Sequence, residues 1–247
     1  MSETFGARGV QIIAQTPQEA VLYKPAGLSS ERGPNDAGES LLTLARARLG
    51  WPDCQLPHRL DRPTRGVMMV SASRSAAALH SSEIREGRWT KWYVARLARN
   101  SSVSGVRVQA TSLLGEHKAY LKREGKFARV VRSGGDPSRL TILAIEAAVD
   151  SADDMHALIR LDTGRFHQIR VMLAALGFPL RGDTDYGGRQ RSDARAGDCA
   201  CIDLEAIALR VAREDATGIY RLATHTDRVG VSASIESALD VATHASP

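Results

Sequence analysis

Residues 57–70, PHRLDRPTRGVMMV, join a charged segment to a short apolar run that is typical of a buried strand. Asp61 is the single acid of this stretch, and three arginines lie within four residues of it: Arg59, Arg62 and Arg65. Nearby positive charge favours the ionised carboxylate, and an ionised Asp at the edge of a strand can act as a nucleophile or a base. The alternative is that Asp61 caps a turn before Pro63 while the arginines are solvated.

A second arginine-rich stretch, DTGRFHQIR, occupies residues 162–170. It follows a strand-like segment at 155–162, and the spacing of apolar residues predicts a helix from about Arg165 to Ala175, ended by Gly177. In the first turn of a helix the dipole disfavours a cation, so Arg165 points to a nearby anion, either Asp61 or a phosphate.

Three other residues and one loop have simple structural explanations. His167 and Gln168 are more often surface or hydrogen-bonded helix residues than catalysts. Tyr93, in the strand-like TKWYVA at 90–95, is typical of a core residue. The Gly/Asp-rich RGDTDYGG at 181–188 reads most simply as a tight loop.

Elsewhere the chain alternates short strands and a few helices. Strands are predicted within 18–28, 67–70, 91–97 and 155–162, several more within 104–148, and helices at 41–49 and 74–86. Because no regular strand–helix–strand alternation appears, the sequence favours an α+β fold on a mixed, largely antiparallel sheet.

Composition excludes several classes of protein. The 247 residues are 43% hydrophobic and 25% charged, which is ordinary for a globular chain of one large or two small domains. We find no apolar run long enough to span a membrane and no secretory signal. Cys54, Cys199 and Cys201 are too few and too scattered for a disulfide framework or a zinc site, so we expect ordinary thiols in a reducing cytoplasm. Phosphate-loop, dinucleotide and metal motifs are absent, and no cofactor or metal is predicted.

The basic residues are clustered. The chain has 33 Lys+Arg against 28 Asp+Glu, a net charge of +5, which by itself only hints at an anionic partner. Segments 85–99 and 118–132 hold many of the cations, and the first interleaves them with Trp89, Trp92 and Tyr93. This mixture suits a phosphate backbone and unstacked bases, although a solvated charged face would look similar.

The motifs, taken together, resemble the RluA-type pseudouridine synthases. His58-Arg59-Leu60-Asp61 with Thr64 and Gly66 resembles the HRLD-x-x-T-S-G motif, and residues 165–170 resemble R-x-H-Q-[IL]-R. Three further elements resemble K-P-x-G-[LM], K-x-Y-x-A and G-D-x-x-Y-G: residues 24–28, 91–95 and 182–187. The five elements occur in the family's order over about residues 20–190. Arg65 departs from the pattern, because it replaces the usual Ser.

The resemblance implies one catalytic domain at 18–247, after an N-terminal extension at 1–17 and without an S4 RNA-binding domain. It would have flanking helices and a central active-site cleft. Such an enzyme isomerises a uridine of rRNA or tRNA to pseudouridine. Asp61 would be the essential carboxylate, Tyr93 would stack on the uracil, and Arg165 would pair with Asp61 and hold the flipped nucleotide. Six residues would contact RNA: Arg59, Arg62, Arg65, Lys91, His167 and Arg170. We expect a cytoplasmic monomer that needs no cofactor or metal.

Two alternatives remain open at this point. The first is a non-catalytic RNA-binding or RNA-remodelling protein on the same fold, which Arg65 keeps plausible. The second is a glycosidase with a carboxylate pair, Asp61 with Asp183 or Asp185, which would release free base or sugar.

Overall fold

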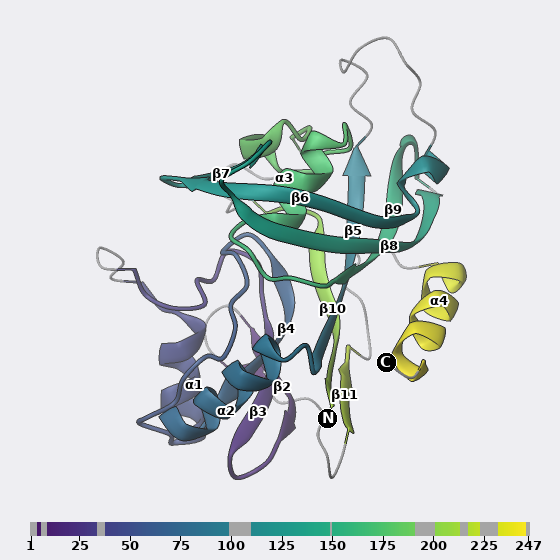
Figure 1. Cartoon of the computed structure of the whole chain (residues 1–247). Helices are drawn as coiled ribbons and strands as arrows, with labels where there is room; N and C mark the ends of the chain where they lie inside the picture. The colour runs from purple at the N-terminus through teal and green to yellow at the C-terminus, as the bar shows by residue number, and fades with distance from the viewer. Residues whose placement is uncertain are drawn as a thin grey trace. The chain divides into compact units, whose positions relative to one another are not determined.

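The computed structural model describes residues 4–5, 9–33, 38–98, 110–148, 150–190, 201–212, 217–222 and 232–245. The chain divides into two compact units. Unit 1 comprises Met1–Thr90 and Ala206–Ala223, and unit 2 comprises Lys91–Glu205 and Thr224–Pro247. Figure 1 labels the elements of both units.

Unit 1 is a sheet with two helices. Its strands follow the order β1-β2-β3-β4-β10, with β11 on β10. The strands are β1 (Thr4–Phe5), β2 (Val10–Gln15), β3 (Glu19–Lys24), β4 (Arg65–Ser71), β10 (Leu204–Ala212, in this unit from Ala206 onward) and β11 (Thr217–Arg221). Antiparallel pairing joins β1 through β4 and also β10 to β11. The helices are α1 (Leu41–Leu49) and α2 (Arg74–Arg85).

Local signals in the sequence place both helices of unit 1. Ser40 and Thr43 form a reciprocal capping box at the start of α1, and Gly50 ends the helix in the left-handed conformation. Ser73 caps α2 by accepting a hydrogen bond from the Ala76 N–H. Every residue of β4 is buried, so the segment that follows the Asp61 loop is central to this unit.

Unit 2 contains a second set of antiparallel strands in the order β5-β9-β8-β6-β7. They are β5 (Trp89–Ala98, in this unit from Lys91 onward), β6 (Gly115–Glu124), β7 (Phe127–Val131), β8 (Asp136–Ala148) and β9 (Ser151–Leu161). The unit also holds α3 (Gln168–Ala175), α4 (Ala233–His244) and two short 3₁₀ turns, η1 (Ala110–Leu113) and η2 (Thr184–Tyr186). Helix α3 packs against β7, and α4 packs against β8 and β9 (Figure 1).

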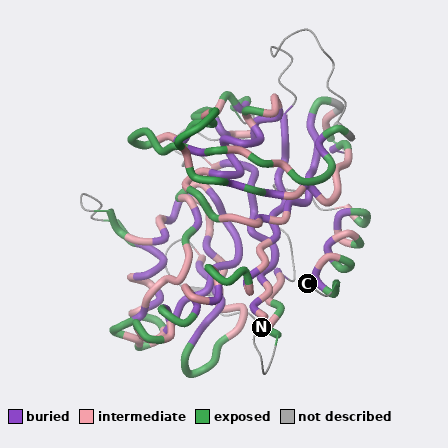
Figure 2. Tube along the Cα trace, in the orientation of Figure 1, coloured by how far each residue is buried: buried purple, intermediate pink, exposed green. Residues whose placement is uncertain are grey.

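Burial follows the strands in both units. In Figure 2, the buried residues concentrate along the strands, whereas turns and outer helix faces are exposed. Strand β6 is largely exposed although it pairs with strands on both sides, and Leu121 is its one buried residue. No helix in the described ranges combines the length and hydropathy that crossing a bilayer requires.

The structure confirms the α+β class and the largely antiparallel pairing, and it corrects one helix boundary. Helix α3 begins at Gln168 rather than at Arg165. His167 has φ 54°, a left-handed conformation that cannot continue a right-handed helix. Arg165 therefore precedes the helix, and the argument from its dipole does not apply. Strand β2 lies within the predicted extension at 1–17 and pairs with β3; the domain boundaries remain a prediction.

Candidate active site

Asp61 begins a tight turn at the edge of β4. Its carbonyl accepts a hydrogen bond from the Thr64 N–H at 3.0 Å, so the turn closes directly before the strand starts at Arg65. Gly66 follows with φ 121°, and a Cβ there would collide with the backbone of Ala206 in β10. The glycine of the motif is therefore needed for the close approach of two strands.

The segment that follows β3 holds the residue after Asp61. The ammonium of Lys24, whose side chain is fully buried, donates to the carbonyls of Leu28 at 2.8 Å, Pro25 at 3.1 Å and Arg62 at 3.4 Å. The Gly27 N–H also donates to the Arg62 carbonyl at 2.7 Å, and the Arg62 Nε donates back to the Gly27 carbonyl at 3.1 Å. These contacts attach the two loops to each other.

Ser30 holds the residue before Asp61. Its hydroxyl donates to the Leu60 carbonyl at 2.7 Å and accepts a hydrogen bond from the Leu60 N–H at 3.2 Å. The backbone is therefore anchored on both sides of Asp61, at Leu60 and at Arg62. Such double anchoring is what a catalytic side chain needs if it is to be held in one geometry.

The three arginines around Asp61 differ in exposure. Arg59 is exposed and forms an ion pair with Glu31 at 3.4 Å. Arg62 is exposed as well, whereas Arg65 is only 3% exposed. Arg59 and Arg62 are therefore accessible, and an RNA contact through them remains a prediction; the burial of Arg65 does not favour the RNA contact predicted for it.

A buried cluster of polar and aromatic side chains contacts His58, the first residue of the Asp61 motif. The Met69 N–H donates to the His58 Nε2 at 3.1 Å, which ties the first residue of the motif to β4. The His58 ring meets the Trp89 ring edge-on at 5.3 Å, and Trp89 meets His80 in the same way at 5.4 Å. The Trp89 Nε1 donates to Glu83 at 3.0 Å.

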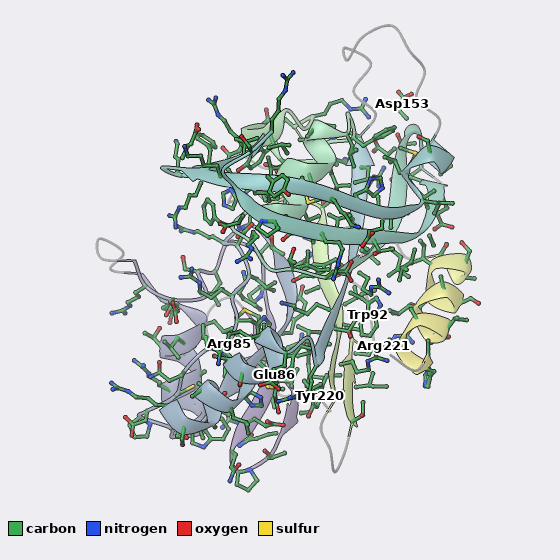
Figure 3. All side chains as sticks on the ribbon, viewed as in Figure 1. Arg85, Glu86, Trp92, Asp153, Tyr220 and Arg221 are labelled. Carbon is green, nitrogen blue, oxygen red and sulfur yellow. The ribbon has the colours of Figure 1, made fainter. Side chains whose placement is uncertain are left out.

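His80 lies between two carboxylates in this cluster. Its Nε2 is 2.9 Å from Glu19 and its Nδ1 is 2.8 Å from Glu83. Burial opposes the charged imidazole, but the hydrogen bonds to Glu19 and Glu83 outweigh it and raise the pKa of His80. Tyr220 of β11, labelled in Figure 3, donates to the other oxygen of Glu19 at 3.3 Å. No sequence motif indicated this cluster, because its members come from five strands and helices and from the loop that holds His58.

Tyr93 and Lys91 lie in β5, in unit 2. Tyr93 is opposite Ile159 of β9 and is 5% exposed, as the simple core explanation expects. Lys91 is opposite Leu161, and burial lowers the pKa of Lys91 to about 8. Lys91 is only partly exposed, and an RNA contact through it remains a prediction.

Arg165 lies in a turn, rather than a helix, and the Gln168 side chain holds this turn by hydrogen bonds. The Gln168 side-chain oxygen accepts hydrogen bonds from the Arg165 N–H at 3.0 Å and from the Thr163 hydroxyl at 2.8 Å. The amide nitrogen of Gln168 donates to the Arg139 carbonyl at 2.9 Å. Gln168 is therefore a buried positioning residue, and Arg165 is exposed, with its Nε 3.5 Å from the Pro137 carbonyl.

His167 is a neutral link between α3 and the loop at 181–188. Arg170 donates to the His167 Nε2 at 3.1 Å. Because a guanidinium cannot accept, that nitrogen carries no proton, and the Nδ1–H faces the Tyr186 hydroxyl at 2.8 Å. Burial, with the Arg170 charge adding to it, lowers the pKa of His167 to about 4.

The Arg170 guanidinium is buried and forms ion pairs with two aspartates. Two of its nitrogens donate to the two oxygens of Asp183, each at 2.7 Å, and one also reaches Asp185 at 3.0 Å. Arg170 is 3% exposed and Asp183 is 1% exposed. Because these ion pairs occupy the Arg170 guanidinium, they do not favour the RNA contact predicted for Arg170.

Comparison with known proteins identifies the family. The sequence model described as RNA pseudouridylate synthase matches residues 18–175. The dual-specificity RNA pseudouridine synthase RluA of Salmonella typhi is 30% identical over 175 residues, which cover 71% of this chain and 76% of that protein. The chain belongs to the RNA pseudouridylate synthase family.

Two further relatives agree with this assignment. Ribosomal large subunit pseudouridine synthase C of Pasteurella multocida is 33% identical over 184 residues, 72% of this chain and 52% of that protein. The structure of human RNA pseudouridylate synthase domain containing 1 shares the fold with a TM-score of 0.69 and 22% identity, over 99% of this chain and 98% of that one. The predicted RluA-type family and isomerase class are confirmed.

As a pseudouridine synthase, the chain distributes its predicted site residues over both units. Unit 1 holds Asp61 with its three arginines, and unit 2 holds the others: Lys91, Tyr93, Arg165, His167 and Arg170. Within each unit the structure joins the motifs by hydrogen bonds, 24–28 to the Asp61 loop and 165–170 to 181–188. In the described ranges, no group of three His, Cys, Asp or Glu side chains could hold a metal ion. Arg99 and Cys199, singled out in the sequence, lie outside these ranges.

Sequence reasoning missed the supporting residues of these motifs. Lys24, Ser30, Gln168 and Tyr186 each carry hydrogen bonds that shape the site. Three of the four lie inside motifs that the resemblance already quoted, so motif membership was the available signal. Ser30 had no signal of its own.

Proposed function

We propose that this chain isomerises one specific uridine in a structured rRNA or tRNA to pseudouridine, with Asp61 as the essential carboxylate. The observation that carries the proposal is the double anchoring of the Asp61 loop through Leu60 and Arg62. A carboxylate held at both neighbouring residues is pre-organised for chemistry at a bound nucleotide.

The reaction breaks the N1–C1′ bond of the uridine and forms a C5–C1′ bond, while C5 loses a proton and N1 gains one. It is redox-neutral, and Asp61 would attack the ribose or abstract a proton from it. A uridine within a stem must first leave the stack, at a cost of a few kcal/mol. Arg165 would pair with Asp61 and hold the flipped nucleotide, and Tyr93 would stack on the uracil.

Phosphate contacts would offset the cost of flipping. The exposed arginines Arg59 and Arg62 suit this role, because a guanidinium presents several donors and does not deprotonate. His167 and Arg170 would act indirectly, by holding the turn that presents Arg165. We further propose that the catalytic domain spans 18–247 and works as a monomer in the cytoplasm.

The test is pseudouridine mapping by carbodiimide on rRNA and tRNA treated with the purified protein. We expect Asp61→Asn to abolish pseudouridine formation while RNA binding persists, and Asp53→Asn, a change at an exposed loop aspartate, to leave it intact. Full conversion by Asp61→Asn would overturn the role of Asp61. Wild-type protein that binds RNA and forms no pseudouridine in any cellular RNA would favour the non-catalytic alternative.

Released uracil would instead indicate a glycosidase. The structure disfavours Asp183 as the second carboxylate of such an enzyme, because both of its oxygens are bound by Arg170. Chromatography of the reaction mixture for free base distinguishes the two reactions, since an isomerase releases nothing.

A further inference from the structure

Three side chains form a stack beside the turn that presents Arg165. The guanidinium carbon of Arg123 lies 4.2 Å from the centre of the Phe166 ring. On its other face Phe166 stacks on the His167 ring at 3.8 Å, with 18° between the planes. Phe166 and His167 belong to the 165–170 motif, whereas Arg123 comes from β6, more than forty residues earlier. The stack therefore attaches a distant basic residue to the motif.

The pairing register explains why Arg123 reaches α3. Arg123 is opposite Ala128 in the β6–β7 pair, on the same side of the hairpin as the buried Leu121. Ala128 is buried too, and β7 packs against α3. The neighbouring pair, Lys122 and Arg129, faces the opposite side.

Tyr186 docks the hairpin. Its hydroxyl accepts a hydrogen bond from the Ala128 N–H at 2.8 Å, and its ring meets Phe127 edge-on at 6.3 Å. Strand β7 ends the strand order among the described residues of this unit, so the Tyr186 hydroxyl satisfies an N–H on the edge of β7 that faces away from β6. The hairpin is thereby held against both motifs of unit 2, at residues 165–170 and 181–188.

Arg123 keeps donors available for a ligand. Its side chain is exposed, and its Nε donates to the Gly125 carbonyl at 3.0 Å. The two terminal nitrogens carry four further N–H groups. Within the described ranges, no carboxylate forms an ion pair with Arg123, whereas Arg129 on the other face pairs with Glu124 at 3.0 Å.

Charge around the stack favours an anion. Lys126 and Arg165 are exposed in the same segments, and Lys126 lies over the Phe127 ring at 5.1 Å. The neutral state of His167 leaves the stack with one positive charge, that of Arg123, so the guanidinium is not repelled by the ring two layers below.

We propose that Arg123, held over the Phe166 ring, is an RNA-binding residue that contacts a phosphate of the strand flanking the target uridine. This inference rests on the proposed function, and it names the β6–β7 hairpin as the surface on which the RNA substrate binds. A guanidinium fork matches phosphate geometry, and its support by an aromatic ring reduces the entropy lost on binding. The β6–β7 hairpin is then a docking element that places RNA beside Arg165.

The test compares Arg123→Ala with Arg129→Ala, a matched loss of one exposed arginine from the opposite face of the same hairpin. RNA binding is titrated on a transcript that the wild-type enzyme modifies, or on total tRNA if none is found, at several salt concentrations. We expect Arg123→Ala to raise Kd about tenfold and to lower the salt slope by about one, and Arg129→Ala to stay near the wild type.

Phe166→Leu tests the stack itself. This substitution keeps Arg123 and removes its aromatic support. We expect it to raise the Kd for RNA, as Arg123→Ala does. A wild-type Kd and salt slope in Arg123→Ala, or an equal loss in Arg129→Ala, would overturn the proposal. Absence of pseudouridine with wild-type protein would instead overturn the proposed function, and the Kd comparison would still decide the contact.

Discussion

Arg170 and Asp183 form a two-pronged ion pair in which both side chains are almost completely buried. The Arg170 Nε and one terminal nitrogen each donate to a different oxygen of Asp183 at 2.7 Å. The pair joins α3 to the loop that follows it and so links the two motifs of unit 2. The same arginine holds the His167 ring and thereby the stack on which Arg123 rests.

Arg170→Met is expected to lower the free energy of unfolding by about 3–5 kcal/mol, because it leaves the buried Asp183 carboxylate without its partner. Urea denaturation measures the change. Arg160→Met is the control, since the Arg160–Asp162 pair is 42% exposed at the arginine and should contribute under about 1 kcal/mol. The double variant Arg170→Met with Asp183→Leu should recover part of the loss. Equal stability of Arg170→Met and Arg160→Met would contradict this account.

Tyr186→Phe removes one hydroxyl and keeps the ring. The Ala128 N–H then loses its acceptor and the His167 Nδ1–H loses its partner, so we expect a loss of about 1–3 kcal/mol in unfolding free energy. Tyr120→Phe on the exposed face of β6 should change it by less than about 0.5 kcal/mol. Thermal melts of the two variants, run together, make the comparison; identical melting temperatures would refute the docking role of Tyr186.

The sequence was sufficient for features that depend on near neighbours. The helices predicted at 41–49 and 74–86 are α1 and α2, and the structure places Gly50 and Ser73 at their ends. Such ends can be predicted because capping is a contact between residues three or four apart. The start of α3 was misplaced because apolar spacing continues through Arg165, while the backbone at His167 turns left-handed. Hydrophobic periodicity carries no information on a single φ angle.

The motif residues of the candidate site could be named from the sequence, but their supports could not. Lys24 meets the Arg62 carbonyl across 38 residues, and Tyr186 meets the Ala128 N–H across 58. Such contacts depend on strand register and loop placement, which local patterns do not specify. For the same reason, burial separates Arg170 from the exposed arginines in the structure although all look alike in the sequence.

Lys24→Met is expected to lower turnover more than RNA affinity. The substitution keeps an apolar stem of similar length but removes the ammonium that donates to three carbonyls, one of them that of Arg62 beside Asp61. Loss of hydrogen bonds from a charged group costs about 1.5–3 kcal/mol, and the Asp61 loop should loosen. Single-turnover pseudouridine formation and RNA affinity are measured side by side. Lys118→Met, at an exposed site, is the control; unchanged turnover in Lys24→Met would exclude the positioning role.

His80 predicts a pH dependence of stability with a definite sign. Hydrogen bonds to Glu19 and Glu83 raise the pKa of His80 above its unfolded value of about 6.5 despite burial. The folded state therefore binds the proton more tightly, and the resulting stability is fully present below about pH 6.5 and is lost as pH rises through the folded pKa.

His80→Gln should remove this component. The difference in unfolding free energy between wild type and His80→Gln is expected to be largest near pH 6 and to shrink as pH rises through the raised pKa of His80. Taking the difference cancels the pH-dependent contributions of other groups. Examples are His167, whose pKa is lowered to about 4, and Lys91, whose pKa is lowered to about 8. A difference for His80→Gln that stayed constant with pH would show that the imidazole is not held in its charged form between the two carboxylates.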